Sequence, residues 1–370
     1  MMTKSKLLAW VMLVASAACC VAGPADVAMG QSRQSRAPTE DSPRLEIVPV
    51  RGNVYLLHGA GANITLSVGR DGVLVVDTGT AAAAARVVAT VQALVKQVVA
   101  APSPAKVCVG LACDAGPVFP SYQATTASPP PAPPIRYVID TSADADHTGG
   151  NAIVGQSGTT IGGGPGVRQF QAVIAASATI YAQERVLRRL SDAKSPAAAW
   201  PTETFTDRFG LYFNGEGVQL LHFDAAHSDG DLIVHFRGSD VISTGDVFST
   251  ESYPKVDLEH GGSINGTLDA LNRLLDLAIP EYQTEGGTLL IPGHGRICDA
   301  ADVATYRDGM TIIRDRIKAM IGRKMTLDQI KAARPTKDYD TRYATREWTG
   351  EAFVEAVYRS LTAPGALTVH

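Results

Sequence analysis

Apolar residues in the first part of the chain form short runs that are separated by glycine-containing turns. The runs span residues 54–58, 63–68 and 73–76. Their length, their content of Val, Ile and Leu and the turns between them predict β-strands. From residue 80 the period changes, because apolar side chains recur at the spacing that places them on one side of a helix. We therefore predict a helix over 80–100 that packs its apolar stripe into a core.

Further apolar runs continue this alternation of strands and helices. More strands are predicted at 136–139, 218–222, 232–236, 241–243 and 288–291. Helical spacing is found near 180–190 and at 267–278, between those runs. Strands that alternate with helices along the chain indicate an α/β fold class.

The last part of the chain has a helical pattern. It predicts helices at 303–321, 326–333 and 349–361, and Thr326 and Gln329 form the capping box of the second one. We interpret residues 301–370 as a helical C-terminal extension of a domain that covers 45–300. Within that domain, residues 101–135 are rich in proline, which is unfavourable to helices and strands alike. They are interpreted as an inserted loop, either a plain solvated one or a lid over a nearby site.

The first 30 residues have the features of a secretory signal peptide. Lys4 and Lys6 precede an apolar stretch over 7–23, and small residues follow at sites suitable for cleavage. We expect a secreted or periplasmic protein with no stable membrane span after cleavage. A retained anchor is the alternative, since the apolar stretch is close to the shortest length that spans a bilayer. The polar residues 31–44 are expected to form a flexible linker.

Composition narrows the range of partners and the redox chemistry. The chain has 370 residues, of which 45% are hydrophobic, so it can bury a large core. A formal net charge of -4 without a basic cluster gives no support for nucleic-acid binding, and a small-molecule substrate is expected instead. Without the leader, the remaining cysteines are Cys108, Cys113 and Cys298. The first two form either a disulfide in an oxidising compartment or two unrelated thiols.

Acidic residues and histidines gather in short segments that follow or lie within apolar runs. The segment 140–151 contains Asp144, Asp146 and His147 directly after a predicted strand, and later segments add His227, Asp246 and His294. If these segments converge, three carboxylates repel one another in a partly dry cleft, and a bound cation removes the conflict. Three of the residues would suffice for a catalytic zinc ion, which lowers the pKa of its water to about 7. The pattern predicts a metal-dependent hydrolase.

The same segments resemble the metallo-β-lactamase superfamily over residues 45–300. The landmarks are Asp77-Thr78-Gly79, the 146–151 segment, the 226–231 segment, and Thr244-Gly245-Asp246 followed by Pro292-Gly293-His294-Gly295. The resemblance implies an αββα sandwich, in which two mixed sheets face each other and loops at one edge hold the metals. It also implies that Asp146, His147 and His294 form the second metal position and that Asp246 is shared between two metals.

Asp77 resembles, in the same family, a carboxylate that orients a ligating histidine. An alternative role is an interaction with the N-terminus of the helix that follows it. Both roles are compatible with the sequence.

The loop for the first metal position departs from the family pattern. The usual His-x-His-x-Asp-His is replaced here by Ser142-Ala143-Asp144-Ala145-Asp146-His147, so that only His227 remains of three expected histidines. Ser142 is a poor zinc ligand, whereas Asp144 resembles the carboxylate at this place in the flavodiiron branch. Iron or manganese tolerates such an oxygen-rich set better than zinc does. Three occupancies stay open: a single metal in the second position, a pair that also uses Asp144, His227 and Asp246, or no working site.

We predict a secreted metallohydrolase, with zinc as the expected metal, that attacks an ester, lactone, lactam or thioester bond with metal-activated water. Asp144 and Asp146 are the candidate catalytic carboxylates, and Asp144 could act as general base if one metal binds. His260 is a further residue that could approach the substrate. The alternative is a catalytically silent metal-binding or structural protein. A rival class is an aspartic protease with Asp77 and Asp140 as its dyad, although a long predicted helix separates these two motifs.

Overall fold

The computed structural model describes residues 44–100, 134–159, 177–279 and 286–363. All of these residues belong to one compact unit. The predicted signal peptide, residues 31–43 of the predicted linker, residues 101–133 of the predicted insertion, and both Cys108 and Cys113 lie outside the described residues.

The first of two sheets has seven strands among the described residues, and they follow one another in chain order. They are β1 (Glu46–Arg51), β2 (Val54–His58), β3 (Ile64–Gly69), β4 (Gly72–Val76), β5 (Ile135–Ile139), β6 (Thr179–Gln183) and β7 (Glu203–Phe205). Neighbours are antiparallel from β1 to β4 and parallel from β4 to β7. Parallel neighbours need a crossover connection, and helix α1 (Ala84–Ala100) lies in the connection between β4 and β5.

The second sheet has six strands within the described ranges. In spatial order they are β13 (Cys298–Asp299), β12 (Leu289–His294), β11 (Val241–Ser249), β10 (Leu232–Phe236), β9 (Glu216–His222) and β8 (Arg208–Phe213). Strands β11 and β12 are parallel, and the other pairs are antiparallel. Both sheets are therefore mixed.

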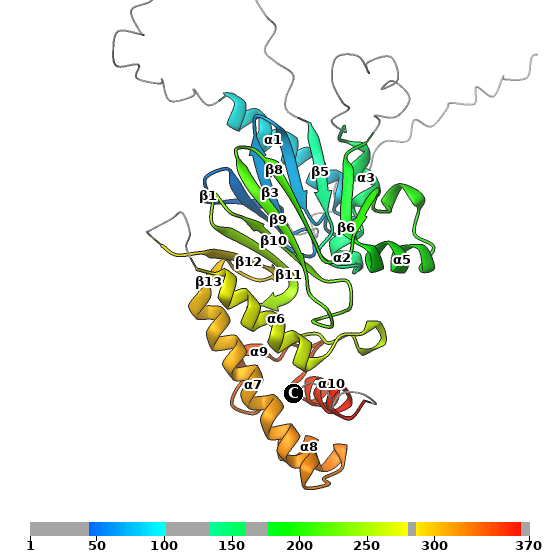
Figure 1. Cartoon of the computed structure of the whole chain (residues 1–370), viewed down its shortest axis with the longest axis vertical. Helices are drawn as coiled ribbons and strands as arrows, with labels where there is room; N and C mark the ends of the chain where they lie inside the picture. Colours follow the sequence, from blue (N-terminus) through cyan, green and yellow to red (C-terminus); the bar gives the residue numbers. More distant parts are fainter. Residues whose placement is uncertain (1–43, 101–133, 160–176, 280–285, 364–370) are drawn as a thin grey trace, which may run out of the picture. The chain divides into compact units, whose positions relative to one another are not determined.

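The two sheets face each other across an apolar core, and helices cover their outer faces (Figure 1). Leu74 and Val76 of β4 belong to the core between the sheets, together with Phe236 of β10. Val73 and Val75 of the same strand pack in the layer that contains α1. Successive strand residues point to opposite faces, so a continuous apolar run such as β4 fills both layers. The arrangement is the αββα sandwich that the sequence predicts.

Helices after residue 300 complete the outer layer on the second sheet. This layer contains α6 (Ile264–Leu277), α7 (Ala300–Gly322), α8 (Leu327–Ala333), α9 (Asp340–Tyr343) and α10 (Gly350–Thr362). Phe353 of α10 stacks on Tyr253 with ring centroids 4.6 Å apart, and Tyr306 of α7 packs edge-on against Phe248 of β11 at 5.1 Å. The C-terminal helices thus share one core with β11 and α6. A search of the described ranges for an apolar helix of membrane-spanning length found none.

Most predicted elements are present, and the differences have local causes. Strands β2 and β10 have the predicted bounds, and the capping box of α8 is formed by Thr326 and Gln329. The helix predicted near 180–190 is wrong in its first part, because 179–183 form β6 and helix α5 (Glu184–Asp192) begins only afterwards. Pairing of β6 with β5 satisfies its backbone groups in the sheet. The helix predicted from residue 80 begins at Ala84.

Candidate metal centre

Loops and strand ends at one edge of the sandwich bring the six predicted ligands together. The first sheet leads to Asp144, Asp146 and His147, which follow β5 at the short helix α2 (Ala145–Thr148). The second sheet leads to His227 in the β9–β10 loop, Asp246 in β11 and His294 at the end of β12. Their ligand atoms form two groups of three. The sequence therefore identified residues that converge in space.

The first group consists of Asp146, His147 and His294, whose ligand atoms lie within 4.8 Å of one another. Asp146 Oδ2 is 3.2 Å from His294 Nε2. Asp246 borders this group, because its Oδ1 lies 3.2 Å from His147 Nε2 and 3.5 Å from His294 Nε2. Two imidazoles and one carboxylate are ligand types that zinc accepts.

The second group consists of Asp144, His227 and Asp246, again with all ligand atoms within 4.8 Å of one another. His227 Nε2 is 3.2 Å from Asp144 Oδ2 and 3.9 Å from Asp246 Oδ2. Asp246 thus has one oxygen toward each group, which is the arrangement of a carboxylate shared by two cations. The second group is richer in oxygen than the first.

Two buried nitrogen atoms show whether the residues fit a metal. His147 Nε2 and His294 Nε2 are buried and make no hydrogen bond with the described residues, although carboxylate oxygens lie 3.2 Å from each. Buried polar atoms are nearly always paired. Both nitrogens belong to the first group, so a cation held there would be their missing partner. The donor set fits a divalent cation.

Further contacts hold the imidazoles in a ligating orientation. Asp77 Oδ2 lies 2.8 Å from His147 Nδ1, and Asp77 also accepts hydrogen bonds from the Thr141 backbone N–H and hydroxyl. His227 Nδ1 lies 2.7 Å from the Lys255 carbonyl oxygen. Acceptors at Nδ1 fix the tautomer that leaves Nε2 free for a metal. Asp77 thus has the contacts expected of a residue that orients a ligand; α1 begins at Ala84, seven positions later, so the helix-terminus alternative is not supported.

The electrostatics of the six residues point to a need for positive charge. Burial opposes ionisation of His227, but its hydrogen bond to the Asp144 carboxylate and the charges of Asp246 and Asp231 raise the pKa of His227 to about 10. Burial likewise disfavours the charged form of His147, but Asp246 and Asp77 raise its pKa well above the ordinary value. The carboxylates therefore favour positive charge at His147 and His227. A divalent cation would provide equivalent charge without protonation of the rings.

The carboxylates respond in the opposite direction. The hydrogen bond with His227 lowers the pKa of Asp144, and the contact with His294 lowers the pKa of Asp146. Burial disfavours the charge of Asp246, yet the neighbouring imidazoles lower the pKa of Asp246 far below its usual range. All three side chains are thus available as anionic ligands at neutral pH.

Two glycines allow Asp246 to approach the first group. Gly245 has a φ of 51°, in the left-handed region, and a Cβ there would meet Thr141 Oγ1 at 2.5 Å. A Cβ on Gly293 would lie 2.8 Å from Asp246 Oδ1 and 2.7 Å from the Gly245 carbonyl oxygen. The register of β11 against β12 also shifts at Gly245. A side chain at Gly293 would push the shared carboxylate away from His147, and one at Gly245 would collide with Thr141.

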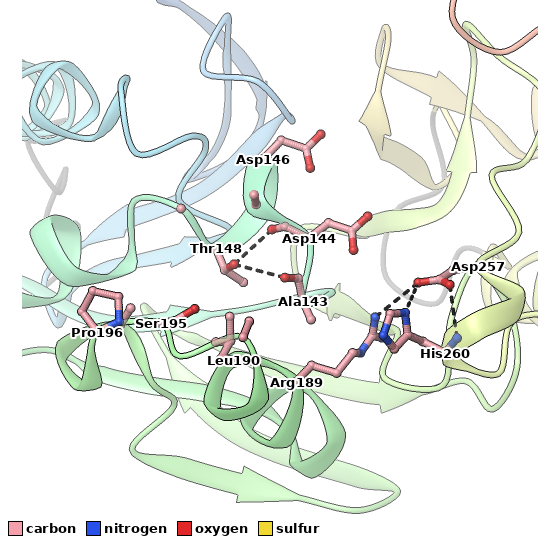
Figure 2. A pocket seen from close by; sticks show the side chains of 14 residues that line it. Ala143, Asp144, Asp146, Thr148, Arg189, Leu190, Ser195, Pro196, Asp257 and His260 are labelled. Carbon is pink, nitrogen blue, oxygen red and sulfur yellow. Dashed lines mark hydrogen bonds and ion pairs between the residues drawn. The ribbon is translucent and has the colours of Figure 1, made fainter.

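A pocket of about 510 Å³ opens beside the metal centre (Figure 2). Asp144 and Asp146 lie on one side of it, and helix α5 with Leu190 lies on the other. His260, in the short helix η4 (Leu258–His260), lines the pocket as well, and its Nδ1 is 2.5 Å from Asp257 Oδ2. The predicted approach of His260 to a substrate is compatible with this position. The volume is typical of small-molecule sites, which span about 300–1,000 Å³.

Sequence reasoning missed several residues of this site. Arg189, Leu190 and Asp257 line the pocket but occur in no recognisable motif, because α5 reaches the site only through tertiary packing. Lys255 contributes a backbone carbonyl, which no side-chain pattern can indicate. These contacts form only when the chain folds, so the sequence alone could not predict them.

Two residues of the predicted loop lie outside the ligand groups. The buried Ser142 hydroxyl accepts a hydrogen bond from the Asp144 backbone N–H at 3.3 Å. Asp140 is buried and accepts a hydrogen bond from Asn151 Nδ2 at 2.8 Å.

The aspartic-protease alternative is wrong, because Asp77 is hydrogen-bonded to Thr141 and His147 and the fold is a helix-covered sandwich instead of two β lobes.

Two solved structures illustrate what this chain is similar to. The stereoselective inverting sec-alkylsulfatase Pisa1 from Pseudomonas sp. matches with a TM-score of 0.56 and 12% identity over 88% of this chain and 51% of that one. This chain therefore spans about half the length of that enzyme. The DIM-1 metallo-beta-lactamase matches with a TM-score of 0.47 and 14% identity, over 72% of this chain and 96% of that one. At 12% identity, the likeness to Pisa1 concerns the fold alone.

The sequence profile of the metallo-beta-lactamase superfamily matches residues 57–294. This range contains both ligand groups and Asp77. No curated protein matches the chain. The profile covers more than half of the sequence, and the chain belongs to the metallo-β-lactamase superfamily.

Proposed function

We propose that this protein is a hydrolase that uses metal-activated water on an ester, lactone, lactam or thioester bond of a small molecule. The observation that carries the proposal is the pair of ligand groups joined through Asp246, beside a pocket that the same loop lines. Membership of a superfamily that consists mostly of metallo-hydrolases supports it.

Two divalent cations per chain are proposed. Each group offers three ligand atoms, and the two oxygens of Asp246 lie toward different groups. Zinc suits the first group, which has two imidazoles, whereas iron or manganese suits the oxygen-rich group of Asp144, His227 and Asp246. When bound, such ions polarise a substrate oxygen and lower the pKa of water.

The residues of the chain have separate tasks in this proposal. Asp77 and the Lys255 carbonyl keep His147 and His227 in one tautomer. Asp144 and Asp146 lie between the ligand groups and the pocket, so a carboxylate oxygen that is not engaged can orient a water molecule or hold a proton there.

Turnover of a mixed panel would test the function. The panel would contain carboxylic esters, lactones, lactams, thioesters and, because one structural neighbour is an alkylsulfatase, secondary alkyl sulfates. Turnover should disappear after chelation, return with added metal, and be lost in Asp246→Asn and His294→Ala. The matched control Asp276→Asn changes an exposed carboxylate of α6 and should keep full activity. Turnover that survives chelation would contradict the proposal.

The second candidate is a catalytically silent metal-binding protein. The observation in its favour is that Ser142 and Asp144 stand where the family pattern has imidazoles. This candidate predicts tight metal binding with no turnover on any panel member.

A secreted or periplasmic location is also proposed, on the composition of the first 30 residues, and N-terminal sequencing of protein recovered from the periplasm or medium would test it.

A further inference from the structure

We propose that the pocket beside Asp144 and Asp146 binds an uncharged, apolar acyl or alkyl group of the substrate. This inference rests on the proposed hydrolase function, because the pocket and the ligand groups share these two carboxylates. A group that enters the pocket would place the bond next to it at the metal centre.

One end of the pocket is mostly apolar. Leu190, Ala193, Pro196 and Ala199 line this end together with the hydroxyl-bearing Ser195, and Ala143 adds a methyl group below Asp144. Figure 2 shows Leu190 and Pro196 on this side, with Ser195 beside Pro196, while Asp257 and His260 lie on the other side. Alanine and proline leave open space where larger side chains would close it. An alkyl chain or a ring here would be removed from water, at a gain of about 25 cal/mol per Å² of buried apolar area.

The opposite end is polar, and the Arg189 guanidinium there lies close to two carboxylates. Arg189 Nη1 is 3.7 Å from Asp257 Oδ2, and Arg189 Nη2 is 3.4 Å from Asp229 Oδ1 and 2.5 Å from Ser228 Oγ. His260 Nδ1 contacts the same Asp257 carboxylate. The guanidinium is thus engaged with two carboxylates, and an anionic substrate group would have to displace them. The pocket selects against such a group.

The experiment measures binding separately from turnover. Linear alcohols of increasing length and ω-hydroxy carboxylates of the same lengths would be titrated against the metal-loaded protein by ligand-observed NMR. The affinity for alcohols should rise roughly twofold to fourfold per methylene until the pocket is filled, since each buried methylene contributes about 0.8 kcal/mol. The hydroxy carboxylates should bind at least tenfold more weakly than the alcohols.

A matched pair of variants locates the binding site. Ala193→Phe fills the apolar end from an exposed position at the end of α5, whereas Ala198→Phe adds the same ring at an exposed position that does not line the pocket. Ala193→Phe should weaken binding of the longer alcohols at least tenfold, and Ala198→Phe should change it less than twofold. Thermal unfolding checks that both variants fold. If Ala193→Phe does not fold, the affinities of the wild type for the alcohols and the hydroxy carboxylates test the proposal by themselves.

The outcomes separate this inference from the proposed function. Length-dependent binding that Ala193→Phe removes, in a protein without turnover, supports the pocket and contradicts the hydrolase. Turnover with affinity that is independent of length, or unchanged in Ala193→Phe, supports the hydrolase and overturns the pocket. Stronger binding of the hydroxy carboxylates than of the alcohols also overturns it.

Discussion

The contact between Asp77 and His147 gives the sharpest test of how the site is organised. In Asp77→Asn, an amide replaces a carboxylate that accepts hydrogen bonds from the Thr141 backbone N–H, the Thr141 hydroxyl and the His147 ring. If the amide nitrogen faces the Thr141 N–H, two donors oppose each other. If it faces His147 Nδ1, the ring must take the other tautomer, with a proton on the Nε2 that should ligate. Both orientations lose a required partner.

The magnitude follows from burial. Asp77 is 1% exposed and the His147 ring is fully buried, so the unpaired group cannot turn to water. One buried unsatisfied donor costs about 1–3 kcal/mol. Loss of an orienting partner typically weakens metal affinity by about 10–100-fold. We therefore expect Asp77→Asn to lower the free energy of unfolding by about 2 kcal/mol and the metal affinity by more than about tenfold.

Asp140→Asn is the matched control for this variant. Asp140 is as buried as Asp77, but it accepts a hydrogen bond from Asn151 alone among the contacts found. Burial raises the pKa of Asp140 well above its usual value, so an uncharged amide resembles the form that the site favours. Urea unfolding of metal-free protein and titration with zinc should show a large effect in Asp77→Asn and a small one in Asp140→Asn. Equal behaviour of the two variants would refute the reasoning.

Further predictions address the metals, the shared carboxylate, the outer helices and a buried thiol. Metal analysis of purified protein should give close to two ions per chain, and Asp144→Ala should reduce this to one; one ion in both proteins would contradict the two-ion proposal. Gly293→Ala should weaken metal binding more than about tenfold by displacing Asp246, whereas Gly217→Ala, whose Cβ has no neighbour closer than 3.9 Å, should not. Phe353→Ala should lower the free energy of unfolding by about 3–5 kcal/mol, measured in urea, because Phe353 is fully buried against Tyr253; a small loss would mean that α10 is dispensable to the core. Burial raises the pKa of Cys298 from 9.0 to about 12, so the thiol holds its proton more tightly in the folded state than in the unfolded state. The contribution of this thiol to the free energy of unfolding is complete below pH 9 and decreases as the pH rises toward 12. Peptide mapping after iodoacetamide treatment at pH 8 should show Cys298 unmodified until the protein unfolds.

The fold was predictable where periodicity and burial agree. The run at 232–236 is buried on both faces and forms β10 with the expected bounds. Residues 179–183 are ambiguous, since the apolar positions of β6 continue into the pattern of α5, and only pairing with β5 decides for a strand. Strand β8 was missed although Phe209, Leu211 and Phe213 alternate with exposed positions, which is the signal of a half-buried strand. Strand β13 is too short to leave a pattern.

The convergence of the six candidate ligands was predictable because each belongs to a short segment with a distinctive order of residues. The pocket was not, because its walls come from α5 and from the loop around Asp257, which are distant in sequence and meet only after folding. The positions of the two Asp246 oxygens, each toward a different ligand group, could not be predicted from the sequence either. The family resemblance implies that this carboxylate is shared. Its two oxygens reach different imidazoles because Gly245 and Gly293 lack a Cβ, which would clash with Thr141 at the first position and with Asp246 itself at the second.

Metal binding at this centre should be coupled to the loss of protons from its imidazoles. Because carboxylates raise the pKa of His227 to about 10 and that of His147 well above its ordinary value, we expect both rings to be charged in metal-free protein at pH 7.5. A ligating imidazole must release the proton on Nε2, so metal binding should expel protons. Calorimetric titration in buffers with different ionisation enthalpies measures their number, which should be between about one and two per chain.

The pH dependence has a definite sign. A raised histidine pKa stabilises the metal-free fold fully below pH 6.5, and this contribution from His227 is lost as the pH rises toward about 10. The metal competes with those protons, so its affinity and the stability that it adds should both increase with pH over the same interval. His227→Gln should reduce the number of released protons by about one, because the charged ring is gone while Asp144 and Asp246 remain. Absence of proton release in the wild type would mean that the carboxylates do not hold the imidazoles charged, and the need for a cation would then lose its electrostatic basis.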